Sequence, residues 1–369
     1  MCVSFWNLVS VAVLSLGDVW YYDFVLLRGE ERKDGTLYWL ELVRFFAATL
    51  VVFAHLSWNV DFYGLDCGEI GVEIFFVMSG IVIALSTQRS GDLRRFFVNR
   101  VSRIVPLYWF VTGAVVVGMS VAPSLFTSST PTAAEIVKSF LFVPYLQESG
   151  KVLPLVEVGW TLCLEMVFYA IYAGSMAISY KWRNAIAVGV LVSLVGLGVV
   201  LQPENLMVAF YLTPKWLAFA FGVGIAVGLA RIQAQPLGQR RTVAVSGAMA
   251  MFLGVCLVIP AVGQVAADTK LVWGVLMGML VLLEVQFGGM KFGWVKTAGA
   301  ITYALYICNL YVIIAGQKVL GRFGLPEIVV GLGLVGASMV VSYGLWKLVD
   351  APGARSCRDW LNGLGRRER

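Results

Sequence analysis

One apolar stretch of membrane length carries the only histidine of the chain, His55, eleven residues after Arg44. On an α-helix, eleven residues make about three full turns, so both side chains share one face, about 16 Å apart along the axis. A charge inside a bilayer costs roughly 2.5 kcal/mol or more unless it faces protein or water. We therefore interpret the pair as lining a path through the protein. The alternative is that Arg44 extends to the membrane surface and His55 is an ordinary polar residue at a helix end.

Two carboxylates lie in other apolar stretches. Glu73, in GVEIFFVMSG, lies on the same side of the membrane as His55, and a carboxylate near an imidazole fixes its tautomer and raises its basicity. Alternatively, Glu73 faces a wet vestibule with no specific partner. Glu165, in GWTLCLEMVFY, lies deep enough in the membrane to indicate function, although it could instead balance Arg44 or Lys215 structurally.

Further polar groups mark two more helices. Arg100 and Arg103, in FFVNRVSRIVPLYW, are three residues apart and fall on neighbouring parts of one helix face just below the membrane. Guanidinium groups pair bidentately with phosphate oxygens, so this pair is a candidate site for a phosphate-bearing cytoplasmic ligand, with ordinary topology signalling as the alternative. Tyr303 and Asn309, in ITYALYICNL, could orient a substrate or hold helices together.

The elements that position these residues are transmembrane helices. The chain is 59% hydrophobic and 14% charged, with a mean hydropathy of +0.81, which indicates an all-α polytopic membrane bundle. Ser79 and Gly80 are predicted to form a close contact between helices. We predict ten spans, over residues 40–58, 70–88, 104–122, 159–180, 185–201, 206–230, 242–260, 271–287, 298–317 and 328–349.

Charge orients the predicted bundle. With both termini in the cytoplasm, the inside segments hold 21 Lys and Arg and the outside loops five, as the positive-inside rule requires. The formal charge of +6 therefore reflects topology, and no nucleic-acid partner is expected. With one histidine and no CxxC spacing, we predict no metal site. The predicted organisation is an extension of uncertain role (1–35), a membrane domain (36–350) and a basic cytoplasmic tail (351–369).

Five motifs in this order resemble the membrane acyltransferase family 3, which includes O-antigen and exopolysaccharide O-acetyltransferases. They are LELVRFFAATLVVFAH, GVEIFFVMSG, RVSRIVPLYW, GWTLCLEMVFY and ITYALYICN, and they cover roughly residues 36–350. The resemblance implies transfer of an acyl group, commonly acetyl, from cytoplasmic acyl-CoA to a hydroxyl presented outside, usually on a sugar. It also implies a multi-pass protein of the inner or plasma membrane.

By position, His55 matches the essential histidine of the family, Arg44 its first-span arginine, and Arg100 and Arg103 its basic pair. Glu165 matches the glutamate of a Trp-Ser-Leu-x-x-Glu-like motif, written here as WTLCLE with threonine for serine. One departure stands out, because many members carry a histidine where this chain has Asn309. The role of that second histidine is therefore absent or altered in this chain.

These residues suit acyl transfer, because a sugar hydroxyl needs a base that works near neutral pH, which histidine supplies. We expect His55 to act as general base or brief acyl carrier, oriented by Glu165 or Glu73. The thioester oxyanion would accept a hydrogen bond from Tyr303, Asn309 or a backbone N–H. The alternative function is a proton-coupled transporter or flippase of a polar or lipid-linked solute. Against it, the sequence shows no evident inverted repeat.

Overall fold

The protein is a bundle of long helices. The structure, a computed structural model, describes residues 38–56, 67–88, 90–121, 131–234, 278–279 and 293–367. Within these residues, eight helical segments are long and apolar enough to cross a bilayer, which confirms the predicted all-α membrane fold. The predicted spans 242–260 and 271–287 (except Gly278 and Met279) and the extension 1–35 lie outside the described residues. The cytoplasmic placement of both termini stays a prediction.

The described elements are helices, with one small hairpin of two antiparallel strands. In chain order they are α2 (Tyr38–His55), α3 (Cys67–Ser86), α4 (Leu93–Val121), α5 (Ala133–Phe140), β1 (Tyr145–Leu146), β2 (Val152–Leu153), η3 (Glu157–Gly159), α6 (Trp160–Ile178), α7 (Arg183–Leu201), α8 (Leu206–Tyr211), α9 (Trp216–Ala234), α12 (Gly293–Leu320), η5 (Gly321–Phe323), α13 (Glu327–Leu345), the π-helical turn η6 (Trp346–Asp350) and α14 (Ala351–Arg367).

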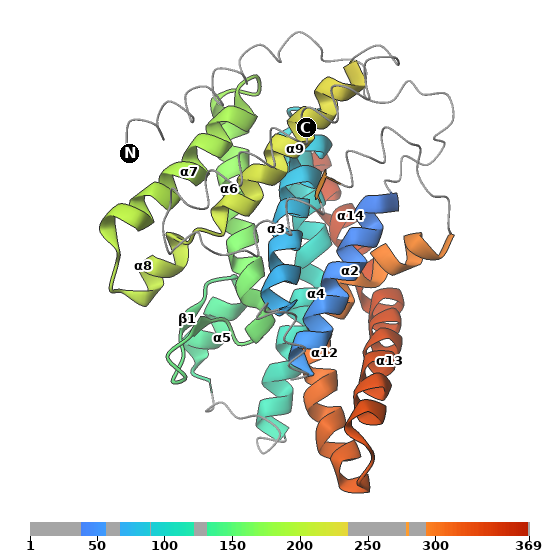
Figure 1. Ribbon diagram of the computed structural model, residues 1–369. Coiled ribbons are helices and arrows are strands. Elements are labelled where there is room, and N and C mark those ends of the chain that lie inside the picture. The colour runs from blue at the N-terminus through green and yellow to red at the C-terminus, as the bar shows by residue number, and fades with distance from the viewer. Residues whose placement is uncertain are drawn as a thin grey trace.

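Helices α3 and α12 form the centre of the bundle (Figure 1). Of the described spans they are the most buried, and helix α2 packs against both of them. Helix α9 covers another side of α3, and α13 packs along α12. Because α3 and the part of α12 up to Ile313 are enclosed by other helices, they carry apolar residues nearly all round, with a few polar groups directed at neighbours.

Small residues bring α3 and α9 into close contact. A Cβ atom placed on Gly80 of α3 would collide with the backbone oxygen of Phe219 and lie 2.9 Å from the Cα of Gly222 on α9. A Cβ on Gly222 would in turn collide with the backbone oxygen of Val77. Membrane helices approach this closely only through such small residues. The predicted close contact at Gly80 is therefore confirmed, whereas Ser79 has a different role described below.

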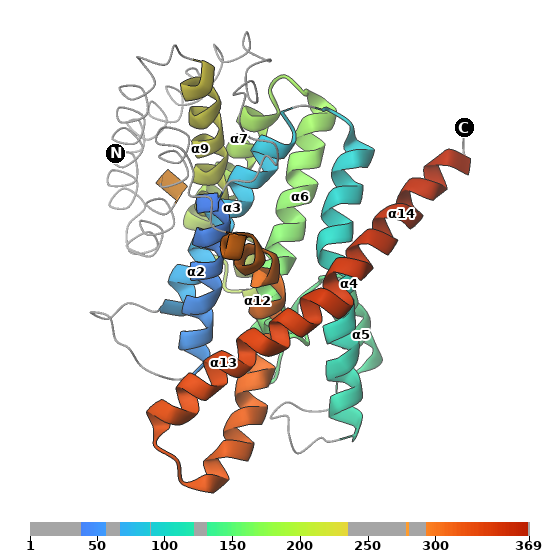
Figure 2. The ribbon, with the colours of Figure 1, turned by 90° about the vertical axis from the view of Figure 1, so that its right-hand side faces the viewer.

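Two helices are longer than expected from hydropathy. Helix α4 begins at Leu93 rather than at residue 104, because the basic segment before the apolar stretch is also helical and extends the helix beyond the apolar span. Helix α13 does not end the fold, since η6 links it directly to α14 and the two form one long tilted rod that crosses α4 (Figure 2). Residues 351–367 of the predicted tail are thus a packed helix.

The α3–α9 crossing generates a stability prediction. Gly222→Val should lower the free energy of unfolding by about 1–3 kcal/mol, the usual cost of overpacking, because the helices must separate to admit the side chain. The measurement is the thermal unfolding midpoint of the purified protein in detergent. Gly228→Val is the matched control on the same helix, because no atom of the described residues lies within 4 Å of a Cβ at Gly228. Equal midpoints for the two variants would contradict the assigned contact.

Candidate active site

A cavity of about 350 Å³ lies among α2, α3, α4, α6, α12 and α14. Its walls follow α3 for three turns, from Val72 to Ile83, which corresponds to about 16 Å along the axis. Its polar lining residues are Arg44, Ser79, Asn99, Arg100, Arg103, Thr161, Glu165, Tyr169, Thr302, Tyr303, Tyr306 and Arg358. Five of the eight residues predicted from the sequence as site residues line this cavity: Arg44, Arg100, Arg103, Glu165 and Tyr303.

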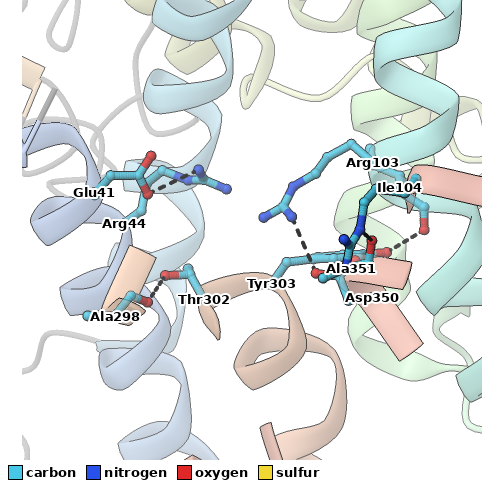
Figure 3. A network of polar contacts seen from close by, with 10 residues as sticks. Glu41, Arg44, Arg103, Ile104, Ala298, Thr302, Tyr303, Asp350 and Ala351 are labelled. Atoms are coloured by element: carbon cyan, nitrogen blue, oxygen red, sulfur yellow. Dashed lines mark hydrogen bonds and ion pairs between the residues drawn. The ribbon is translucent and has the colours of Figure 1, made fainter. Parts of the chain in front are cut away.

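The arginines of the cavity converge from different helices. Arg44 on α2 and Arg103 on α4 point toward one another from opposite sides (Figure 3). Arg44 lies 3.6 Å from the carboxylate of Glu41, one helical turn earlier. Arg103 lies 3.3 Å from Asp350, which is buried beneath it at the π-helical turn, and the Arg103 guanidinium lies 5.6 Å from the centre of the Tyr303 ring. Arg100 donates to the Ser86 hydroxyl at 3.1 Å.

Glu165 is held in place by two hydroxyl groups. Ser79 of α3 donates to its Oε1 atom at 2.7 Å, and Tyr169, one turn along α6, donates to the same atom at 2.5 Å. This places the carboxylate on the wall of the cavity, facing the same space as Arg44 and Arg100. A carboxylate in this setting offsets part of the positive charge that the arginines create.

His55 contacts Asn309. The Nδ1 atom of the imidazole lies 2.5 Å from Oδ1 of Asn309 on α12. The amide nitrogen of Asn309 donates to the carbonyl oxygens of Leu305 and Tyr306, both at 2.8 Å, so its oxygen faces the ring. Because an amide oxygen only accepts hydrogen bonds, Nδ1 must carry the proton, and in the neutral ring the lone pair is on Nε2.

The face of α2 between Arg44 and His55 is packed. Ala48 is fully buried and Val51 is 4% exposed, and both contact neighbouring helices. In the described part of the chain, the cavity lining includes Arg44 but not His55. The continuous lined path expected from the shared face is thus closed in this structure. Tyr306, which lines the cavity, lies one turn before Asn309 on α12, so the cavity approaches His55 along that helix.

The Glu73 carboxylate pairs with an amine. Its Oε1 atom lies 3.2 Å from Nζ of Lys215, at the start of α9, and the side chains of both residues are largely buried. Lys215 also lies 5.7 Å from the centre of the Trp160 ring. A buried carboxylate and ammonium compensate each other's desolvation, which gives Glu73 a structural partner in addition to any contact with a substrate.

The hydroxyl groups near the cavity are partly committed to the backbone. Tyr303 donates to the carbonyl oxygen of Ile104 at 2.8 Å. The hydroxyls of Thr161 and Tyr306 lie 2.8 Å apart, and both lie within hydrogen-bond distance of the carbonyl oxygen of Val158. Since one hydroxyl donates to the other and the remaining proton goes to that carbonyl, both protons of the pair are in use, and a ligand in the cavity could accept one only in exchange for one of these bonds.

Several residues of the site are not predicted from the sequence to have a role in it. Ser79 and Tyr169 hold Glu165, Asp350 holds Arg103, and Arg358 on α14 lines the cavity. Tyr169 lies four residues after Glu165, a spacing that places both on one helix face and could have suggested the contact. Asp350 is the only acidic residue between Glu327 and Asp359, a signal that could have marked it.

Comparison with known proteins identifies the family. The family model for an acyltransferase domain (acyltransferase family 3) matches residues 37–347, which is most of the chain. The chain belongs to membrane acyltransferase family 3. This confirms the resemblance carried by the five motifs.

Several curated relatives of this acyltransferase domain are known by name. The exopolysaccharide production protein ExoZ of Rhizobium meliloti is 36% identical over 42% of this chain and 49% of its own length. Nodulation protein 10 of Rhizobium leguminosarum is 32% identical over 48% of this chain and 54% of its own length. The peptidoglycan O-acetyltransferase OatA of Listeria monocytogenes is 28% identical over 36% of this chain and 24% of its own length. The chain thus spans about half or less of these relatives. No solved structure matches it significantly.

The buried Glu73–Lys215 pair generates a prediction for this acyltransferase domain. Lys215→Met should lower the free energy of unfolding by about 3 kcal/mol or more, because it removes the counter-charge of a buried carboxylate. The double variant Glu73→Gln/Lys215→Met should recover most of that loss, since no uncompensated charge remains. Thermal unfolding of the three proteins in detergent is the measurement. A double variant as unstable as Lys215→Met would refute a structural pairing.

Proposed function

We propose that this chain is an integral-membrane O-acyltransferase that moves an acyl group from cytoplasmic acyl-CoA to a hydroxyl of a carbohydrate or glycoconjugate. Acetyl is the proposed acyl group, and the cell inner or plasma membrane is the proposed location. One observation carries the proposal: an arginine-rich cavity approaches, along α12, a histidine held by Asn309. The names of ExoZ and OatA, which refer to exopolysaccharide and peptidoglycan, support a polysaccharide acceptor.

The lining of the cavity supports an acyl-CoA as the donor. Arg44, Arg100 and Arg103 provide guanidinium groups for its phosphates, which pair with guanidinium bidentately. The apolar residues that follow α3 for about 16 Å suit the pantetheine arm, which carries the thioester at its far end. With the phosphates at the arginines, the arm extends toward Tyr306 and the thioester comes near the His55–Asn309 pair.

His55 acts as the general base in this mechanism. Its Nε2 lone pair accepts the proton of the acceptor hydroxyl while the hydroxyl oxygen attacks the thioester carbon. A carbon–oxygen bond forms, the carbon–sulfur bond breaks, and the CoA thiolate leaves. The imidazolium then returns its proton to the thiolate, which restores the neutral ring. Asn309 holds Nδ1–H throughout, so the role proposed for it changes from substrate binding to orientation of His55.

The developing negative charge on the thioester oxygen needs a donor. Tyr303 and Asn309 already donate to backbone carbonyl oxygens. The Thr161 and Tyr306 hydroxyls bond each other and Val158, and both residues line the cavity, so one of these bonds can be exchanged for a bond to the thioester oxygen without breaking a helix contact to another backbone carbonyl. We therefore assign the oxyanion contact to this hydroxyl pair.

The proposed mechanism makes a prediction for His55. His55→Ala should lower transfer of radiolabelled acetyl from acetyl-CoA to envelope glycans by about 10²–10⁴-fold, the usual contribution of a general base. Membranes that hold wild type and variant at matched expression provide the measurement. Labelling equal to wild type would remove His55 from the mechanism. Absence of labelling in wild type with acetyl, succinyl or longer donors would instead favour the transporter alternative.

A prediction for Asn309 distinguishes between two roles, orientation of the His55 ring and binding of a substrate. Asn309→Leu should lower kcat about tenfold or more with little change in KM for either substrate, because the imidazole loses the hydrogen bond that fixes its tautomer. Asn309→His should retain more activity, since a ring nitrogen can accept from Nδ1–H in place of the amide oxygen. A large rise in acceptor KM with unchanged kcat would favour substrate binding by Asn309.

A further inference from the structure

The C-terminal helix α14 lies against the arginine-rich end of the cavity. It continues from α13 through the π-helical turn η6 and crosses α4, which carries Arg100 and Arg103 (Figure 2). Single π-helical turns inside longer helices are often found at functional sites, because they redirect the side chains that follow. Here the turn places Asp350 against Arg103 and starts α14 at the cavity wall.

Contacts at several points along α14 hold it on α4. At its start, Asp350 pairs with Arg103. Gly353 then crosses Pro106 so closely that a Cβ atom on the glycine would lie 3.0 Å from the proline Cβ. Further along, Arg94 donates to the carbonyl oxygen of Leu361 at 2.6 Å. The segment between these contacts therefore has a defined position beside the cavity.

Arg358 lies in that segment and lines the cavity. Its side chain is exposed, and among the described residues no carboxylate forms an ion pair with it. Arg44 and Arg103, by contrast, each have a carboxylate within 3.6 Å. The Nε atom of Arg100 is buried without a hydrogen-bond partner in the described part of the chain. The cavity thus has positive charge that its own carboxylates do not balance, and this favours an anionic ligand.

We propose that α14 is a wall of the acyl-donor site and that Arg358 contacts a phosphate group of the donor. This inference rests on the proposed function and extends it to a helix outside the family match, which ends at residue 347. An acyl-CoA carries a diphosphate and a separate ribose phosphate, so it presents more phosphate charge than Arg100 and Arg103 alone can pair with. Arg358 adds a guanidinium from α14, a different helix from the one that carries Arg100 and Arg103.

The experiment compares a donor that carries phosphates, acetyl-CoA, with one that carries none, S-acetylpantetheine. Arg358→Ala should raise KM for acetyl-CoA about tenfold, the effect of losing one charge-assisted hydrogen bond, and should leave kcat unchanged. Its kinetics with S-acetylpantetheine, which lacks phosphate, should equal those of wild type. Arg355→Ala is the matched control, since Arg355 is exposed on the same helix and bonds the backbone of α14 at Ala351. It should behave as wild type with both donors.

Other outcomes overturn the inference in distinguishable ways. Equal KM values for Arg358→Ala and Arg355→Ala with acetyl-CoA would remove Arg358 from the donor site. Equal losses with both donors would mean that Arg358 is only structural. Binding of CoA to the purified full-length protein, measured by calorimetry, is independent of turnover. A wild type that binds CoA while Arg358→Ala binds about tenfold more weakly supports the inference even if transfer fails, whereas absence of wild-type binding overturns both proposals.

Discussion

The cost of burying charge in a lipid bilayer is the constraint on which this structure depends. Each charged group within the described spans must face protein, a cavity or a counter-charge. The structure satisfies this requirement in two ways. Glu73 and Lys215 compensate each other within the packed bundle, whereas Arg44, Arg103 and Glu165 face a shared cavity. The first arrangement stabilises the fold, and the second leaves charge accessible to a ligand.

Close helix packing is what allows the cavity to persist between these groups. The α3–α9 crossing at Gly80 and Gly222 brings two backbones together on one side of α3. The opposite side of α3, from Val72 to Ile83, can then face an open space without leaving the helix unsupported. Lipid provides no hydrophobic drive for helix association, so such small-residue contacts do the work that apolar burial does in water.

The fold and part of the site were predictable from the sequence for one reason. Hydropathy, the positive-inside count and the face shared by Arg44 and His55 are properties of one helix or loop at a time, so the sequence of that segment is enough to predict them. Partners across helices depend on packing, which one sequence does not reveal. Thus Lys215 as the partner of Glu73 was not predicted, nor was the packing of Ala48 that closes the face between Arg44 and His55. The sequence likewise gives no sign that Arg358, in the predicted basic tail, lies on a helix that packs beside the cavity.

The choice of an amide as the partner of His55 has a consequence for the proposed chemistry. A carboxylate in place of Asn309 would add a charge within the buried part of α12, where an unpaired charge is costly. An amide fixes the tautomer of the ring without that charge, because both of its N–H groups are satisfied by α12 itself. In the proposed reaction the imidazolium exists only while the oxyanion or the thiolate exists, so the transient positive charge is always accompanied by a transient negative one. Such a base suits the proposed reaction, because the negative charge of the acyl donor is already paired with the arginines of the cavity.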